Sequence, residues 1–186
     1  TEYVASKTNS TEPVMLIYNK KLSVSPLTTH IPIKNVFRNV QKKKIINNII
    51  KIDKFYKSTL KKKPFIAILG LNPHCETISR ISEEKKEIIP AINYLSKKGF
   101  KVSGPFPADT FFLEKNIKKF DVVLGMYHDQ VLTPAKTLYE FEAINITLGL
   151  PFLKITPDHG PNYQMLGKNI SDASSIFYAF NFINKI

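Results

Sequence analysis

The sequence is poor in three residue types, since its 186 residues include one cysteine, no tryptophan and only two arginines. The single Cys75 excludes an internal disulfide and a metal site built from several thiolates, as is usual in a reducing compartment. No apolar run approaches the roughly 20 residues that a membrane-spanning helix needs, and no apolar signal segment follows Thr1. These absences favour a soluble, cytoplasmic protein without a membrane partner. The missing initiator methionine indicates either processing or a piece of a longer chain.

Lysine gives the chain a formal net charge of +12. The lysines cluster at 42–44, 61–63 and 97–98, on or at the ends of predicted helices, where a solvated face is the usual arrangement. Nucleic-acid-binding surfaces more often mix arginine with aromatic residues, and no recognised binding motif is present. We therefore expect no nucleic-acid partner. An anionic small substrate is at least as natural a target for this positive field, although lysine-driven nucleic-acid binding stays an alternative.

Apolar runs alternate with amphipathic segments along the chain. Strands are predicted at 13–18, 65–70, 121–126, 144–148 and 152–155, with a short one at 100–102. Helices are predicted over 36–60, from Ser82 to before Gly99, and from Ser171 or Asp172 through Asn181. Segment 27–33 reads as extended, and the proline-rich segment 104–109 as a loop of fixed shape. This alternation predicts an α/β fold with a mostly parallel or mixed sheet flanked by helices.

Three histidines follow predicted extended segments: His30, His74 and His128. In open α/β sheets, ligands gather beyond the carboxyl ends of the strands. Three imidazoles that meet at one sheet edge match an open metal site, and neutral imidazole suits zinc and several other divalent ions. Each histidine alone is more often a hydrogen-bonded structural residue, and the spacing is no compact metal signature. Both interpretations stay open on placement alone.

Cationic and amide side chains come after His128, and three of them are spaced to reach the same sheet edge. They are Lys136, Asn145 and Lys154. Lysine offers a point charge to phosphate and an amide adds directed hydrogen bonds, although any one lysine of this chain is more often a surface residue. The segment 158–160, Asp-His-Gly, is a candidate for acid–base chemistry or for ordering its loop. Neither a Gly-x-Gly-x-x-Gly motif nor a P-loop supports a standard nucleotide site.

Six motifs occur in a fixed order along the chain. They are Thr28–Pro32, Gly70–His74, Gly104–Thr110, Met126–Gln130, Asn145–Phe152 and Asp158–Gly160. Taken together, they closely resemble the 4-hydroxythreonine-4-phosphate dehydrogenase family of the pyridoxal phosphate pathway, and Thr1-Glu2 resembles the tail of its His-Thr-Glu motif. The resemblance implies a fold similar to that of isocitrate and isopropylmalate dehydrogenases, which bind NAD without the glycine fingerprint. It also implies that residues 1–186 are the C-terminal part of a longer chain whose N-terminal lobe is partly missing.

The activity that the resemblance implies is oxidation of 4-phosphohydroxy-L-threonine with NAD or NADP. The product, 2-amino-3-oxo-4-phosphooxybutanoate, loses carbon dioxide to give 3-amino-2-oxopropyl phosphate on the route to pyridoxine 5'-phosphate, a form of vitamin B6. The family works as a homodimer with its site at the subunit interface. Two departures leave the substrate less certain than the metal: Lys154 replaces an arginine, and the loop 75–80 lacks the family's glycines. A paralogue acting on threonate or erythronate 4-phosphate and a catalytically silent metal-binding fragment are the alternatives.

The residues that the resemblance assigns fall into two groups. The ligands of one divalent metal ion (zinc, magnesium or cobalt) are His30, His74 and His128, and the substrate contacts are Thr1, Lys136, Asn145 and Lys154. We add Asp109 and Asp129, which are placed to orient a ligand imidazole or to relay a proton.

Overall fold

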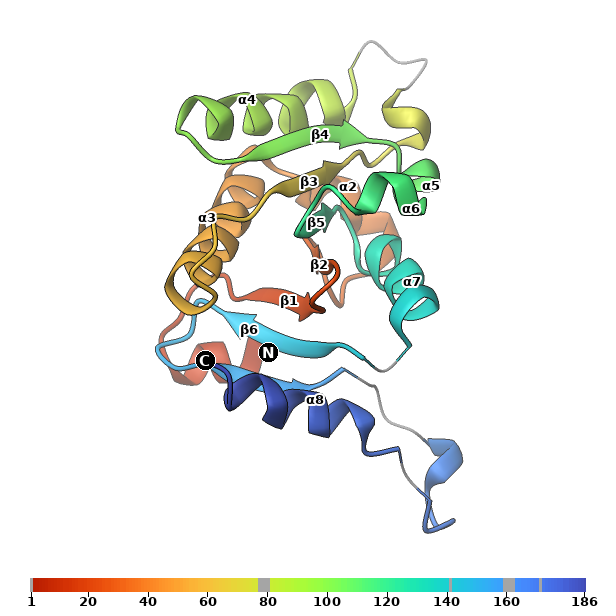
Figure 1. Cartoon of the computed structure of the whole chain (residues 1–186). Helices are drawn as coiled ribbons and strands as arrows, with labels where there is room; N and C mark the ends of the chain where they lie inside the picture. The colour runs from red at the N-terminus through yellow and green to blue at the C-terminus, as the bar shows by residue number, and fades with distance from the viewer. Residues whose placement is uncertain (1, 77–80, 141, 159–162, 171) are drawn as a thin grey trace.

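The structure is a computed structural model that describes residues 2–76, 81–140, 142–158, 163–170 and 172–186. Its centre is a seven-stranded sheet with the order β4-β3-β5-β2-β1-β6-β7 (Figure 1). In chain order the strands are β1 (Val14–Tyr18), β2 (Ser23–Pro26), β3 (Ile66–Leu69), β4 (Val102–Phe106), β5 (Val122–Gly125), β6 (Ile144–Leu148) and β7 (Lys154–Pro157). Residues 1, 77–80, 159–162 and 171 carry several of the predictions above, and these lie outside the described residues.

The sheet has a parallel half and an antiparallel half. Strands β4, β3, β5 and β2 run parallel to one another, whereas β1, β6 and β7 are each antiparallel to their neighbours. The predicted α/β fold with a mixed sheet is therefore confirmed. The carboxyl ends of the four parallel strands share one edge of the sheet, which we call the histidine edge because the loops with His30, His74 and His128 begin there.

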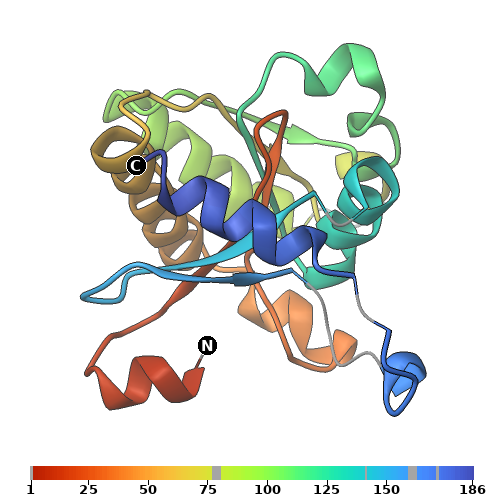
Figure 2. The same cartoon turned by 60° about the horizontal axis from the view of Figure 1, so that its bottom comes forward.

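Helices cover both faces of the sheet (Figures 1 and 2). On one face pack α3 (Lys42–Thr59), α4 (Ile89–Lys97) and α8 (Ser174–Ile183), and on the other α5 (Ala108–Phe111), α6 (Glu114–Ile117) and α7 (His128–Tyr139). The remaining helices are α1 (Glu2–Lys7), η1 (Ile33–Asn35), α2 (Val36–Asn39), η2 (Pro73–Cys75), the π-helix η3 (Glu84–Ile88) and η4 (Tyr163–Met165). None of the described helices is long and apolar enough to cross a bilayer.

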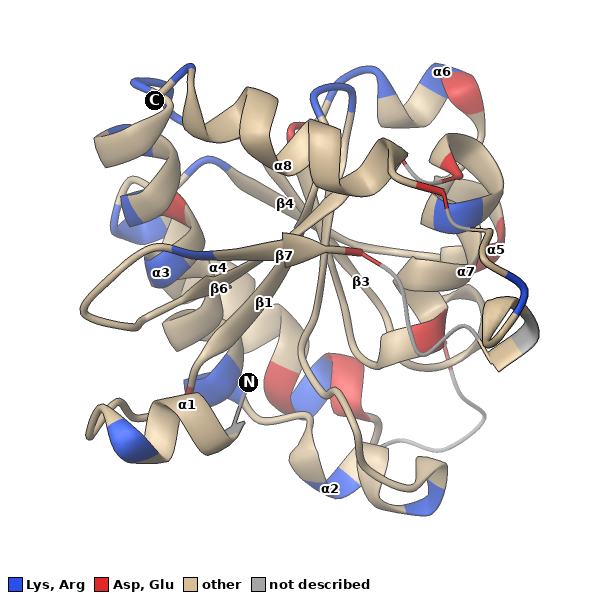
Figure 3. Cartoon of the chain, turned by 90° about the horizontal axis from the view of Figure 1, so that it is seen from below, with Lys and Arg blue, Asp and Glu red and all other residues tan. Residues whose placement is uncertain are grey.

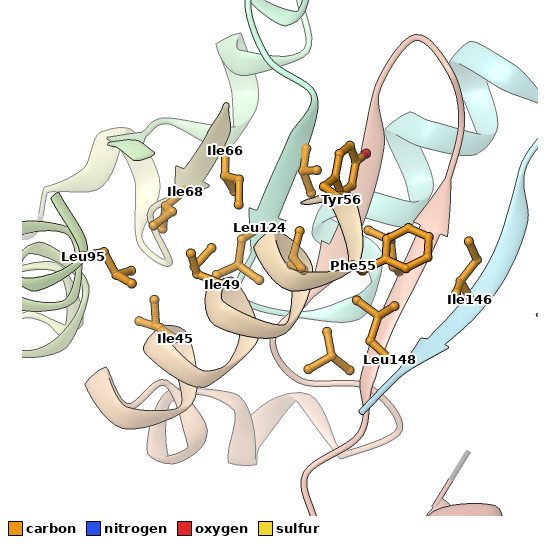
Figure 4. Packing of buried hydrophobic residues seen from close by; sticks show 14 of the residues in the cluster. Ile45, Ile49, Phe55, Tyr56, Ile66, Ile68, Leu95, Leu124, Ile146 and Leu148 are labelled. Atoms are coloured by element: carbon orange, nitrogen blue, oxygen red, sulfur yellow. The ribbon is translucent and has the colours of Figure 1, made fainter. Parts of the chain in front are cut away.

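Two hydrophobic clusters lie on the two faces of the sheet. Figure 4 shows the first, in which Ile49 of α3 lies beside Leu124 of the sheet and Ile45 lies toward Leu95 of α4. The second cluster joins Ile17 of β1 to Val131 of α7. Burial on both faces explains why the strands read as unbroken apolar runs instead of alternating with polar residues.

The helix predicted over 36–60 is broken in the structure, so this prediction was wrong. The chain forms α2 and then α3, with Val40 in an extended conformation between them. Helical spacing advances about 100° per residue, so the five-residue step from Val40 to Ile45 turns the apolar face by about 140°. Both side chains are buried in the same cluster, and the break is what allows this.

The segment predicted as a strand at 100–102 and a loop at 104–109 also differs. Strand β4 continues through Gly104 and Pro105, and α5 begins at Ala108. Proline is tolerated here because β4 is the edge strand, and its register with β3 shifts between Ala67 and Leu69. The extended segment predicted over 27–33 is likewise displaced, since the strand is β2 and it ends at Pro26.

The ends of two predicted helices agree closely with the structure. Ser82 Oγ accepts a hydrogen bond from the Lys85 N–H at 3.3 Å, and α4 ends at Lys97, before Gly99. Asp172 Oδ1 accepts the Ser174 N–H at 2.8 Å, although α8 runs on to Ile183. The side chains that these patterns identify as caps therefore act near the helix starts.

Candidate active site

The histidine edge collects one candidate residue from the segment after each parallel strand. Along the sheet order β4-β3-β5-β2, these residues are Asp109, His74, His128 and His30. The arrangement follows from topology, because parallel neighbours must end on the same side. His128 follows the strand between the other two histidine-bearing strands, so it is the central member of the set.

His30 and His128 lie together. Their ring centroids are 5.9 Å apart with an interplanar angle of 42°. The two segments are tied by Thr28, whose hydroxyl donates to the Met126 carbonyl oxygen at 2.8 Å. His128 is the first residue of α7, and its Nδ1 lies 2.6 Å from Asp129 Oδ1. A neutral His128 that donates from Nδ1 to this carboxylate keeps the lone pair on Nε2, as a metal-ligating histidine does.

His74 stands at the next strand end along the sheet. It lies in η2 with a left-handed φ of 56°, and its Nδ1 is 3.7 Å from Asp109 Oδ2. This separation is too long for a hydrogen bond. It allows an ion pair when the ring is protonated. The side chains of His74 and Asp109 are 78% and 53% exposed, so both are open to solvent in this chain.

The three histidines do not form one ligand group within this chain. Among the described residues, no three His, Cys, Asp or Glu side chains are arranged to hold a metal ion. The structure brings His30 and His128 together and places His74 with Asp109. Two adjacent imidazoles suit a divalent first-row metal, but a third ligand is needed for a stable open site. The three-histidine site therefore stays a prediction.

The predicted substrate residues lie over β6, β7 and α7. Asn145 pairs across the sheet with Ile17, and Thr147 pairs with Lys154, so register and pleat put these polar side chains on the face that α7 also covers. Asn145 Oδ1 and Thr147 Oγ1 are buried and accept or donate no protein hydrogen bond within the described part of the chain. Buried polar atoms of this kind need a partner, which makes this face a candidate for a polar ligand.

Lys136 and Lys154 occupy different ends of that polar face. Lys154 begins β7, opposite Thr147 near the carboxyl end of β6, and so lies toward the histidine edge. Lys136 Nζ forms an ion pair with Asp158 Oδ2 at 2.6 Å and a hydrogen bond to the Asp158 carbonyl oxygen. Asp158 follows β7, which runs away from that edge. The three candidates thus share a region of the molecule, and their joint contact with one substrate stays a prediction.

The lysine clusters lie where the sequence places them. Residues 42–44 open α3, residues 61–63 follow it, and Lys97 ends α4. Figure 3 shows blue lysines along α3, whereas red acidic residues occur around α5 and α7. The lysine clusters therefore lie at both ends of the sheet: residues 42–44 are at the end that carries the histidine edge, and residues 61–63 and Lys97 are at the opposite end.

A family model described as "Pyridoxal phosphate biosynthetic protein PdxA" matches residues 1–183. The chain belongs to the PdxA family. Curated relatives named 4-hydroxythreonine-4-phosphate dehydrogenase include one from a Sulfurihydrogenibium species, 44% identical over 181 residues, and one from Aquifex aeolicus, 41% identical over 187 residues. These alignments cover 96% and 100% of this chain but only 56% and 58% of the relatives. The chain therefore spans little more than half the length of the PdxA proteins it matches.

Solved PdxA structures share the fold. The 4-hydroxythreonine-4-phosphate dehydrogenase of Klebsiella pneumoniae is 33% identical with a TM-score of 0.83, over 97% of this chain and 57% of that one. The enzyme of Burkholderia phymatum is 32% identical with a TM-score of 0.80, over 99% and 56%. A terephthalate 1,2-cis-dihydrodiol dehydrogenase of Burkholderia xenovorans, 21% identical with a TM-score of 0.72, shares the fold alone. The family resemblance read from the motifs is thus confirmed.

In this PdxA chain, the loop that carries His74 is held by a carboxylate that the sequence reading missed. Glu84 is 1% exposed, and its Oε1 accepts the N–H groups of Leu71 and Asn72, each at 2.8 Å. Its Oε2 accepts the Asn72 side-chain amide at 2.9 Å. Burial opposes ionisation, but these hydrogen bonds outweigh it and lower the pKa of Glu84.

The lowered pKa of Glu84 predicts how the stability of the fold depends on pH. Because its folded-state pKa lies below the ordinary 4.5, its ionised form stabilises the fold above that pH, and the stabilisation is lost as the pH falls through the folded value. Glu84→Gln is expected to lower the unfolding free energy by about 1–3 kcal/mol at pH 7. As the pH falls from about 5 to about 3, the variant should then lose less unfolding free energy than the wild type loses. Urea unfolding across this range is the measurement. Glu87→Gln, which makes neutral the exposed acceptor of the Lys42 N–H, is the matched control. Parallel curves for wild type and Glu84→Gln would contradict the assignment.

Proposed function

We propose that this chain supplies the metal- and phosphate-binding part of a PdxA enzyme, which oxidises 4-phosphohydroxy-L-threonine with NAD or NADP. The observation that carries the proposal is the pairing of His30 with His128 at the shared end of parallel strands in a chain of this family. The 3-oxo acid that results loses carbon dioxide to give 3-amino-2-oxopropyl phosphate. Because the relatives are nearly twice as long, the proposal concerns a cytoplasmic enzyme of the relatives' full length.

The donor set supports one divalent ion, zinc, magnesium or cobalt, held by His30, His74 and His128. Such an ion lowers the pKa of a bound alcohol and polarises the ketone that forms from it. Since one chain groups only two of these ligands, the proposal includes a homodimer in which a second subunit completes the set. Asp129 beside His128 and Asp109 beside His74 would each orient an imidazole or hold a proton.

The polar face over β6 and β7 is proposed to bind the substrate. Lys136 and Lys154 offer positive charge to the phosphate, and the buried Asn145 Oδ1 needs a donor such as a substrate amino or hydroxyl group. Lys136 is held by Asp158, which limits where its Nζ can reach. Lys154 replaces the family's arginine, so it contributes a point charge in place of a planar two-donor fork. Thr1, the remaining substrate residue, lies outside the described residues.

Assays of the full-length enzyme test the proposal. With NAD or NADP, activity on 4-phosphohydroxy-L-threonine is expected to exceed that on threonate or erythronate 4-phosphate. Activity on the last two alone would identify the paralogue. Absence of any turnover by the folded, metal-loaded full-length protein would refute the proposed dehydrogenase activity and leave metal binding as the function.

Lys136 carries a quantitative prediction in the same assay. Lys136→Ala is expected to lower kcat/KM by about 10- to 100-fold, mainly through KM, because it removes one charge-assisted contact to phosphate. Lys115→Ala on the exposed α6 is the matched control and should behave as wild type. An unchanged KM in Lys136→Ala would remove this lysine from the phosphate site.

A further inference from the structure

Gln130 is a buried amide that joins two strand ends of the histidine edge. It is 9% exposed, and its Oε1 accepts the Met126 N–H at 2.6 Å while its Nε2 donates to the Gly70 carbonyl oxygen at 2.8 Å. Met126 directly follows β5, and Gly70 directly follows β3. A single side chain therefore holds the roots of the two segments that carry His128 and His74.

The carboxamide of Gln130 takes the place of a peptide group. The ladder between β3 and β5 ends at the pair Ile68 and Leu124, so the Gly70 carbonyl and the Met126 N–H lie beyond it. An amide offers one acceptor and one donor, as a backbone peptide does, and here it satisfies both groups in a buried place. The hydrogen-bonded spacing of the two strands is thereby continued up to the loops.

The surroundings leave room for this amide and for little else. A Cβ placed on Gly125 would lie 3.0 Å from Gln130 Oε1 and 2.4 Å from Val131 Cγ1. The Gly70 N–H donates to the Phe106 carbonyl oxygen at 2.9 Å, and so Gly70 is fixed on both sides. Gln130 is the third residue of α7, from which a side chain commonly reaches back to a backbone N–H before the helix. Here the other end of the same amide also reaches across to the next strand.

We propose that Gln130 is a positioning residue, which fixes the starts of the His74 and His128 segments and so the places from which these two imidazoles reach the metal sites of the proposed homodimer. The proposal rests on the proposed function in one respect, namely that these histidines bind a metal. The contact itself is independent of that function. Partners that orient metal ligands typically change metal affinity by about 10- to 100-fold when they are lost.

Two substitutions in the full-length protein separate positioning from simple helix capping. Gln130→Met keeps the length and removes both hydrogen bonds. Gln130→Glu keeps the acceptor for the Met126 N–H but turns a carboxylate toward the Gly70 carbonyl, so only the link between the strands is lost. Tyr56→Phe is the matched control, because it removes a buried hydrogen bond of 2.9 Å to Ser23 at the opposite end of β2.

The measurements are titration with Co²⁺ alone, followed by its visible absorption spectrum, and amide hydrogen exchange of residues 70–76. Both Gln130 variants are expected to bind Co²⁺ about 10- to 100-fold more weakly, with an altered spectrum and faster exchange at 70–76. Tyr56→Phe should change neither. Wild-type affinity, spectrum and exchange in a folded Gln130→Glu would overturn the proposal and leave capping as the only role.

The proposed function and the positioning role fail in different ways. If wild-type protein binds no Co²⁺ at the histidines, the metal part of the proposed function fails. The exchange measurement then decides the positioning role alone: faster exchange at 70–76 in the Gln130 variants but not in Tyr56→Phe supports it, and unchanged exchange overturns it. If Gln130→Met does not fold, the comparison of Gln130→Glu with Tyr56→Phe decides in the same way.

Discussion

His128→Ala is expected to abolish stable metal binding and to lower kcat/KM of the full-length enzyme by at least about 100-fold, since loss of even an outer partner costs about 10- to 100-fold. The effect should be the largest of the three histidine substitutions. His128 follows β5, which lies between the strands before His30 and His74, and it already lies beside His30 with its ring held by Asp129. Its loss removes the central ligand of the proposed set, which His30 and His74 complete.

Metal content of the purified protein is the direct measurement. His30→Ala, His74→Ala and His128→Ala should each fall well below wild-type occupancy, while Lys118→Ala, which removes an exposed ion pair with Glu114, should not. Asp129→Asn is expected to lie between these extremes, because it weakens the hold on one imidazole without removing a ligand. Full occupancy in any one histidine variant would exclude that residue from a shared site.

The pattern of apolar residues predicted those strands of the sheet that are buried on both faces. The unbroken apolar runs that became β3 and β5 are buried on both faces, and no other structure suits them as well. Strand β2 was missed because its sequence, Ser-Val-Ser-Pro, resembles a loop. Ser23 and Ser25 are fully buried in the fold, and the Ser25 hydroxyl donates to the Met15 carbonyl oxygen at 2.7 Å. This partner lies on the neighbouring strand β1, and its contact with Ser25 leaves no periodic pattern in the sequence.

The candidate site also has features that the local sequence predicts and features that depend on distant contacts. That His74 and His128 come after strands could be read directly, and parallel pairing then placed them at one edge. Their exact relation could not be read, because His74 adopts a left-handed backbone conformation and its segment is held by the distant Glu84 and Gln130. In the sequence these two side chains are ordinary polar residues near helix starts. The ordered motifs, which identify the family, carried more about function than spacing did.

Gly104→Ala is expected to destabilise the fold severely, by at least about 3 kcal/mol or to the point of aggregation. Gly104 has a φ of +142°, and a Cβ there would lie 2.3 Å from the Ile68 carbonyl oxygen. That atom belongs to the backbone of β3, which is paired on both sides by β4 and β5 and cannot move away as a flexible side chain would. Either the register shift between β3 and β4 is lost or β3 leaves its place in the core.

Urea unfolding of the full-length protein measures this effect, with Ser103→Ala as the neighbouring control on β4. Ser103→Ala should stay within about 0.5 kcal/mol of wild type, since it trims a half-buried side chain that already has a Cβ. A Gly104→Ala protein within about 1 kcal/mol of wild type would show that β4 can be displaced cheaply. Because β4 leads directly into α5 and Asp109, a cheap displacement would also mean that the contact between Asp109 and His74 is not fixed by the sheet. The predicted large loss ties that contact to the close approach of Gly104 to the β3 backbone.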